Sequence, residues 1–163
     1  MNRRVADFFL IVPAAVGLWS LSQLCHPAVA APAPDAVAVL AAVCPLKPTD
    51  TAGLRRVLTG GRVLVARLDG PVDKPFRAVH RVLMPEGGEW VISRLSPGGR
   101  LRRISLEWHA PAPDGLRPVI AVNASGDCRV TEGRRLIYDS DGRADTLEVL
   151  SADLAEVVFR EAL

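Results

Sequence analysis

The chain has 163 residues, and its 20 lysine and arginine residues nearly balance its 18 aspartate and glutamate residues, for a net charge of +2. This balance argues against a nucleic-acid-binding protein, because such proteins carry a strong basic excess. Aromatic residues make up 5% of the chain, too few for a platform on which bases or sugars stack.

The first predicted element is a signal peptide over residues 1–30. The chain opens with MNRR, continues with an apolar run over 8–21, and then reaches the small residues Ala28-Val29-Ala30. These are the three parts of a secretory signal. The apolar run contains Pro13 and is shorter than the roughly 18 to 20 residues that cross a bilayer. We therefore predict cleavage after Ala30, with a periplasmic or secreted product that keeps no stable membrane anchor.

The cysteines predict one disulfide. Cys25 lies within the signal peptide, which leaves Cys44 and Cys128 in the mature chain. Two thiols in an oxidising compartment usually pair, and closing a loop of this length contributes about 4 kcal/mol in the chain-entropy treatment. A metal site needs further ligands, and neither His80 nor His109 lies at a zinc-like spacing from a cysteine. We expect a Cys44–Cys128 disulfide and no metal or cofactor.

The mature chain is predicted to form one domain over 37–163, preceded by an Ala/Pro-rich leader at 31–36. The short apolar segment 37–43 is compatible with either a helix or a strand. The next segment, TDTAGLRRVLTGG, is typical of a helix that begins after an aspartate or threonine N-cap and stops at a glycine pair.

After this helix, the apolar period changes to that of β-strands. Ile104, Leu106 and Trp108 alternate with polar residues, which indicates one packed face and one solvated face and places Trp108 in the core. The final segment 151–163 favours an extended arm over a short helix. We predict a mainly β fold, an antiparallel meander or half-open barrel, with one or two short helices. The expected strands cover 62–68, 76–84, 89–95, 100–109, 117–123, 129–138 and 145–150.

The acidic stretch Asp139-Ser140-Asp141-Gly142 predicts a hairpin turn. Part of a calcium loop is the alternative, but such a loop needs oxygen ligands at alternating positions and Ile137 occupies one of them. A two-residue turn at Asp141 and Gly142, of the type I′ form, is the commoner use of this pattern.

The sequence contains no recognisable catalytic motif. Ser125 lacks the flanking glycines of a nucleophile elbow, and His80 and His109 lie in strand patterns that favour structural or exposed histidines. Cys128 is expected to be in the disulfide and therefore not a nucleophile. We expect no catalytic residues.

Two groups of charged residues, a pair of glutamates and a basic cluster, are also candidates for a functional site. Glu89 and Glu107 face each other in one possible hairpin register, where cross-strand salt bridges to Arg94 or Arg102 are expected in place of a carboxylate pair. The basic cluster at 100–103 is expected to be divided by alternation, with Arg103 on the face opposite Arg102, and to act as a solvated edge.

Two stretches resemble known families. YDSDGR at 138–143 resembles the core of YD-repeat hairpins in large bacterial secreted proteins, and this single copy supports a turn. Residues 128–163 are similar to the segment just ahead of the catalytic domain in exported bacterial subtilisin-like serine proteases. That resemblance implies a non-catalytic N-terminal or pro-region, since the aspartate, histidine and serine motifs of the family are absent.

The sequence therefore predicts an exported, non-catalytic, β-rich interaction module with a protein partner in the cell envelope. One alternative is the protease-associated region that the resemblance implies. The other is a periplasmic carrier whose curved sheet holds an apolar ligand.

Overall fold

The computed structural model describes residues 35–70, 76–96 and 101–163, so the predicted signal peptide, with its cleavage at Ala30, lies outside the described part. Two short helices precede eight strands along the chain. These elements are α1 (Ala36–Val43), α2 (Thr51–Val57), β1 (Arg62–Asp69), β2 (Phe76–Leu83), β3 (Glu89–Ser96), β4 (Arg103–Ala112), β5 (Gly115–Ser125), β6 (Val130–Tyr138), β7 (Ala144–Leu150) and β8 (Val157–Ala162).

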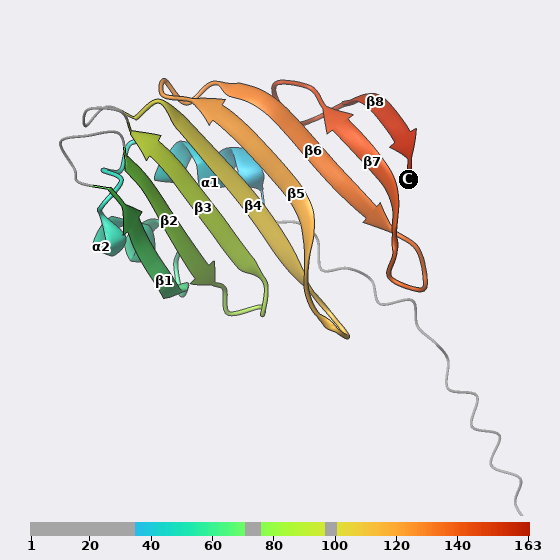
Figure 1. Ribbon diagram of the computed structural model, residues 1–163, viewed down its shortest axis with the longest axis horizontal. Coiled ribbons are helices and arrows are strands. Elements are labelled where there is room, and N and C mark those ends of the chain that lie inside the picture. The colour runs from blue at the N-terminus through green and yellow to red at the C-terminus, as the bar shows by residue number, and fades with distance from the viewer. Residues whose placement is uncertain (1–34, 71–75, 97–100) are drawn as a thin grey trace, which may run out of the picture.

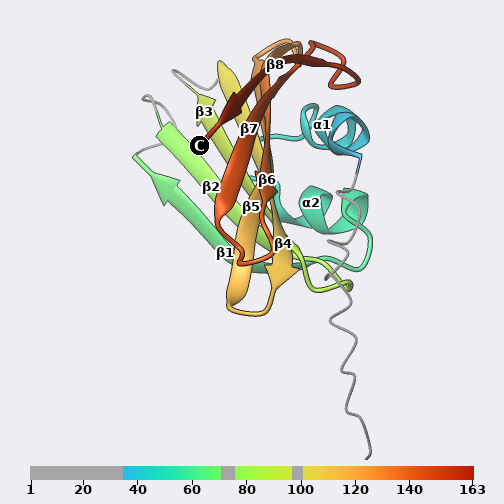
Figure 2. The same cartoon turned by 90° about the vertical axis from the view of Figure 1, so that its right-hand side faces the viewer.

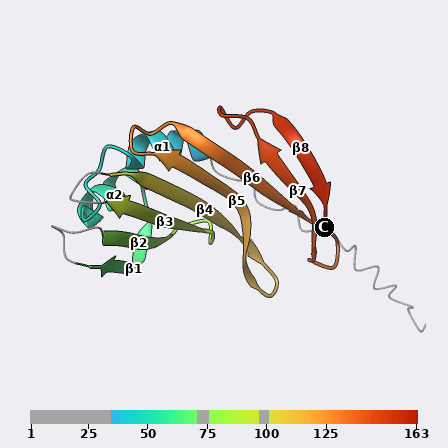
Figure 3. The same cartoon turned by 45° about the horizontal axis from the view of Figure 1, so that its top comes forward.

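The strands form one antiparallel meander, as the sequence predicted. Each strand pairs with the next along the chain, in the order β1-β2-β3-β4-β5-β6-β7-β8 (Figure 1). The sheet is twisted and curved, and it does not close into a barrel, because β1 and β8 lie at opposite edges (Figure 3). The final segment is a strand, in agreement with the expected extended arm.

Both helices lie on the same side of the sheet (Figure 2). The segment that was compatible with helix or strand is α1, and the Asp35 side chain caps it by accepting from the Val37 and Ala38 N–H groups. Asp50 caps α2 in the same way, through a 2.7 Å bond from the Gly53 N–H. Within the part of the chain described above, neither helix has the length and apolarity to cross a membrane.

The core lies between the helices and the sheet. Leu40 and Val43 of α1, with Leu54 of α2, are buried against the strands. At the centre, the rings of Trp90 and Trp108 pack with centroids 5.3 Å apart, and both side chains are fully buried. Trp108 is thus in the core, as alternation predicted. A Cβ at Gly88 would lie 2.0 Å from the Trp108 ring, so this glycine makes room for the indole.

The side of the sheet that carries the helices is called the helix face, and the other side the open face. One row of directly paired residues crosses the helix face from β2 to β8. The row is apolar from β2 to β5 and charged from β6 to β8. Its members are Val82, Trp90, Trp108, Ile120, Arg135, Glu148 and Arg160.

The charged end of this row is an ion triad. Glu148 of β7 accepts from the Arg135 Nε at 2.7 Å and from the Arg160 Nε at 2.9 Å. The side chain of Glu148 is 1% exposed because the two arginines cover it. Hydrogen bonding from Arg135, reinforced by Arg160, holds the pKa of Glu148 below its ordinary value.

The predicted disulfide between Cys44 and Cys128 is present, with the two Cα atoms 6.0 Å apart. Cys44 directly follows α1, and Cys128 lies in the turn between β5 and β6. The bond therefore fixes the first helix to the middle of the sheet, across 84 positions of sequence.

Candidate functional site

The acidic tip between β6 and β7 is a hairpin turn, but its loop is longer than predicted. The Asp139 N–H donates to the Arg143 carbonyl oxygen, and the Gly142 N–H donates to the Asp139 carbonyl oxygen. The loop therefore has three residues, 140–142, in place of two. Gly142 has a φ of +78° and Asp141 is not in the left-handed region, whereas a type I′ turn requires positive φ at both central residues.

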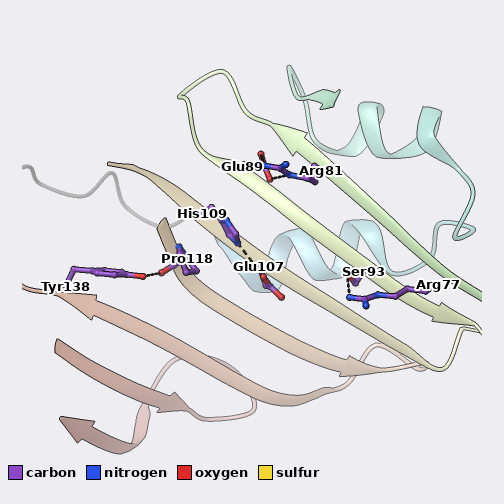
Figure 4. A network of polar contacts seen from close by, with 8 residues as sticks. All are labelled: Arg77, Arg81, Glu89, Ser93, Glu107, His109, Pro118 and Tyr138. Atoms are coloured by element: carbon purple, nitrogen blue, oxygen red, sulfur yellow. Dashed lines mark hydrogen bonds and ion pairs between the residues drawn. The ribbon is translucent and has the colours of Figure 1, made fainter. Parts of the chain in front are cut away.

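The residues weighed for catalysis lie apart from one another. His80 is buried on the helix face, whereas His109 is on the open face with its Nε2 atom 3.4 Å from Glu107 Oε2 (Figure 4). Ser125 Oγ donates to Asp127, and neither histidine is among its described partners. Among the described residues, no group of histidine, cysteine, aspartate and glutamate side chains is placed to hold a metal ion.

The two glutamates of the β3–β4 hairpin do not form a pair, and their partners differ from those predicted. Glu89 lies opposite His109 in the register, and its buried carboxylate accepts from the Arg81 guanidinium at 2.5 and 2.7 Å (Figure 4). Glu107 contacts His109. The predicted bridges to Arg94 or Arg102 are therefore wrong, because Arg94 points to the helix face.

The open face is hollowed by two adjoining depressions between β2 and β6. Their volumes are about 400 and 320 Å³, and both are lined by Leu95 and Arg103. We call this pair of depressions the open-face groove. No acidic residue of the described chain lines it, and its polar lining includes Arg77, Ser93, Arg102, Arg103, Ser105 and Asn123.

Three arginines line this groove: Arg77 of β2, Arg103 at the start of β4, and Arg102 just before it. The Arg77 Nη2 atom donates to Ser93 Oγ at 3.3 Å, across the β2–β3 pair (Figure 4). Arg102 and Arg103 both line the groove. Strand β4 begins at Arg103, so Arg102 immediately precedes the strand, and its N–H donates to the Leu95 carbonyl oxygen at 2.8 Å.

Arg94 is the buried residue that sequence reasoning missed. Its side chain is 0% exposed, and Nη1 donates to the carbonyl oxygens of Leu46 and Lys47 at 3.0 and 2.9 Å, which ties the α1–α2 connection to β3. Burial lowers its pKa to about 10, opposed by the charge of Asp50. Burial, with the Arg94 charge, lowers the pKa of nearby His80 to about 4.

Strand β8 is the second candidate site. All six of its residues are exposed, including Val158 at 62% and Phe159 at 55%. The strand pairs with β7 along one edge, and no strand of the described chain pairs with its other edge. An exposed apolar edge of this kind offers unpaired backbone groups and apolar surface together.

Comparison of the chain with protein-family models, with curated proteins and with solved structures gives no match in any of the three.

Proposed function

We propose that the protein is an exported, non-catalytic interaction module whose strand β8 pairs with an extended segment of a protein partner in the cell envelope. The observation that carries this proposal is the exposure of β8 described above. A partner strand would satisfy the backbone N–H and carbonyl groups of the free edge, and its side chains would cover Val158 and Phe159. The required partner chemistry is an extended segment with apolar side chains on both of its faces.

Two observations support export. The sequence of residues 1–30 has the parts of a signal peptide, and the Cys44–Cys128 disulfide is the kind of bond that persists in oxidising compartments.

A second candidate is the N-terminal or pro-region of a secreted subtilisin-like protease. The segment that resembles this family, 128–163, contains β6, β7 and β8, and therefore the whole of the exposed edge. The partner strand would then belong to a catalytic domain. A carrier for an apolar ligand is less well supported, because Trp90 and Trp108 fill the space under the helices and most residues that line the open-face groove are polar.

The test is site-specific photo-cross-linking of the exported protein at Val158, Arg160 and Ala162. Leu68, an exposed apolar residue on the opposite edge strand, is the matched control position. Strand pairing predicts that the three β8 probes bond to positions spaced two apart in one extended segment of one partner, and that Leu68 does not. The substitution Phe159→Asp is expected to abolish these adducts.

Three results would overturn the proposal: equal cross-linking at Leu68, adducts to a second copy of this chain, or adducts scattered over unrelated proteins. A catalytic protease domain as the partner would select the second candidate over the general one.

A further inference from the structure

We propose that the open-face groove binds a phosphate group, either free or carried by a small molecule or lipid headgroup. This inference is independent of strand pairing at β8, because the groove lies between β2 and β6 on the open face of the sheet.

The register brings two arginines to opposite sides of Leu95, beside a row of paired serines. Arg77, Leu95 and Arg103 lie directly opposite one another on β2, β3 and β4. Because neighbouring strands are about 4.8 Å apart, the two arginine backbones are separated by about 10 Å, a span that two guanidinium groups reach across. Ser93 and Ser105 form the adjacent paired row and supply hydroxyl groups between them.

The acidic groups beside the groove already have other partners. Asp69, which pairs with Arg77 in the register, is held by Arg67 with a 2.6 Å contact. Glu132, at the other side of the groove, forms an ion pair with Arg134.

Hydrogen bonds from Arg134 and Asn123, and more weakly the charge of Arg103, lower the pKa of Glu132, so the described residues compensate the positive charge of the groove only in part. Among the described residues, Arg77, Arg102 and Arg103 form no ion pair, although arginines elsewhere on the sheet do. Glu132 also accepts a 3.0 Å bond from Asn123, so its carboxylate is occupied on both sides. An anion entering the groove would meet two or three arginines and no free carboxylate of the described chain.

The spacing favours phosphate over carboxylate. A carboxylate is planar and is best met edge-on by a single guanidinium group. A phosphate directs its oxygens several ways, so Arg77 and Arg103 can bind different oxygens while the serine hydroxyls bind a third. Leu95, 39% exposed between the two arginines, offers apolar contact to a group attached to the phosphate.

The first experiment is a titration of the purified protein with inorganic phosphate at constant ionic strength, followed by NMR of the arginine side chains. We expect saturable shifts of the Arg77 and Arg103 Nε–H signals, and at least a tenfold weaker affinity in the double variant Arg77→Gln/Arg103→Gln. Arg55→Gln/Arg56→Gln is the matched control, because it removes the same two charges from exposed arginines of α2, outside the groove. It is expected to leave the affinity unchanged.

Two results would overturn the proposal. One is a set of shifts spread over all exposed arginines, with equal losses in the control and double variants. The other is acetate or an acidic peptide binding as tightly as phosphate at the same ionic strength. A thermal melt of each variant checks that it is folded, and Arg103→Gln alone serves if the double variant is not.

Vesicle sedimentation then distinguishes the source of the phosphate. Vesicles of phosphatidylcholine with phosphatidylglycerol are compared with phosphatidylcholine alone, in the presence and absence of free phosphate. Sedimentation that requires Arg77 and Arg103 and is competed by phosphate assigns a lipid headgroup. Phosphate binding without sedimentation assigns a small soluble ligand.

Discussion

The two halves of the helix face are built from opposite chemistry. From β2 to β5, where α1 and α2 cover the sheet, the central row consists of apolar residues around Trp90 and Trp108. From β6 to β8, the same row continues as the triad of Arg135, Glu148 and Arg160. The strand pairing is continuous across both halves, so the difference follows from what covers the sheet and not from the sheet itself.

The two halves differ in how they contribute to stability and in how much of their surface is exposed. The covered half gains its stability from burial of large side chains, which scales with the apolar area removed from water. In the uncovered half, charged side chains shield one another and leave the outermost strand exposed. Both outermost strands, β1 and β8, are largely exposed, and the edge that we propose for a partner lies in the half with the smaller core.

The largest expected difference between the two halves is tested by truncating one large side chain in each. Trp108→Ala should lower the free energy of unfolding by about 3 to 5 kcal/mol, because it leaves a cavity under the helices. Phe159→Ala should change it by less than about 1 kcal/mol, since the ring is more than half exposed. Urea denaturation of both variants measures the difference, and similar losses would show that β8 belongs to the same core.

Removing the disulfide is the next largest change. The double substitution Cys44→Ser/Cys128→Ser should lower stability by about 2 to 4 kcal/mol, chiefly because the unfolded chain regains the freedom of a long loop. Reduction of the wild-type protein should have the same effect in urea denaturation and none in the double variant. A loss in the double variant alone would point to poor packing of serine.

The buried histidine makes the stability of the covered half depend on pH. His80 has a folded pKa of about 4, below its ordinary 6.5, so the unfolded chain takes up the proton first as the pH falls. Above pH 6.5 the histidine is neutral in both states and does not lower the free energy of unfolding. Between pH 6.5 and 4 its protonation in the unfolded chain lowers the free energy of unfolding, by about 3 kcal/mol in total. In the variant His80→Leu, the free energy of unfolding measured by urea denaturation should not show this dependence on pH between 6.5 and 4.

His109→Gln is the control for this experiment, because His109 lies on the open face and is expected to leave the slope intact. Equal slopes in wild type and His80→Leu would contradict the assignment.

The smallest expected effect lies in the uncovered half. Glu148→Gln should reduce stability by on the order of 1 kcal/mol, because it leaves Arg135 and Arg160 without their shared counter-ion while both stay partly solvated. The lowered pKa of Glu148 means that the wild-type contribution is present above its ordinary pKa and is lost as the pH falls below it. Glu161→Gln, an exposed residue on β8, should have no measurable effect.

Much of the fold could be predicted because its signals are local. Residue types and turn signals outlined the strands, alternation placed Trp108 in the core, and the turn residues between strands implied that sequence neighbours pair. The Cys44–Cys128 bond was predicted by counting the thiols outside the predicted signal peptide. The sequence did not distinguish a helix from a strand for the α1 segment, because Ala36–Val43 is apolar throughout and too short to show either period.

The polar contacts were less predictable, because they depend on register. A glutamate on β3 has neighbours on two strands. Glu89 forms its ion pair with Arg81 of β2 and not with a residue across the predicted hairpin. Arg94 shares the alternation phase of Trp90 and Ile92, and this was the signal that it faces the core. The hairpin at Gly142 was located correctly, whereas its loop length depended on backbone angles that the residue types do not fix.

The neighbour-only order of the strands also sets a sequence of assembly. As the chain emerges N-terminus first, each strand can join its predecessor at once, without waiting for a distant segment. Cys128 follows β5 in the chain, so the bond that links α1 to the sheet cannot form before the first five strands are present. The edge proposed for the partner belongs to β8, which comes after every other strand of the described chain and pairs only with its predecessor β7.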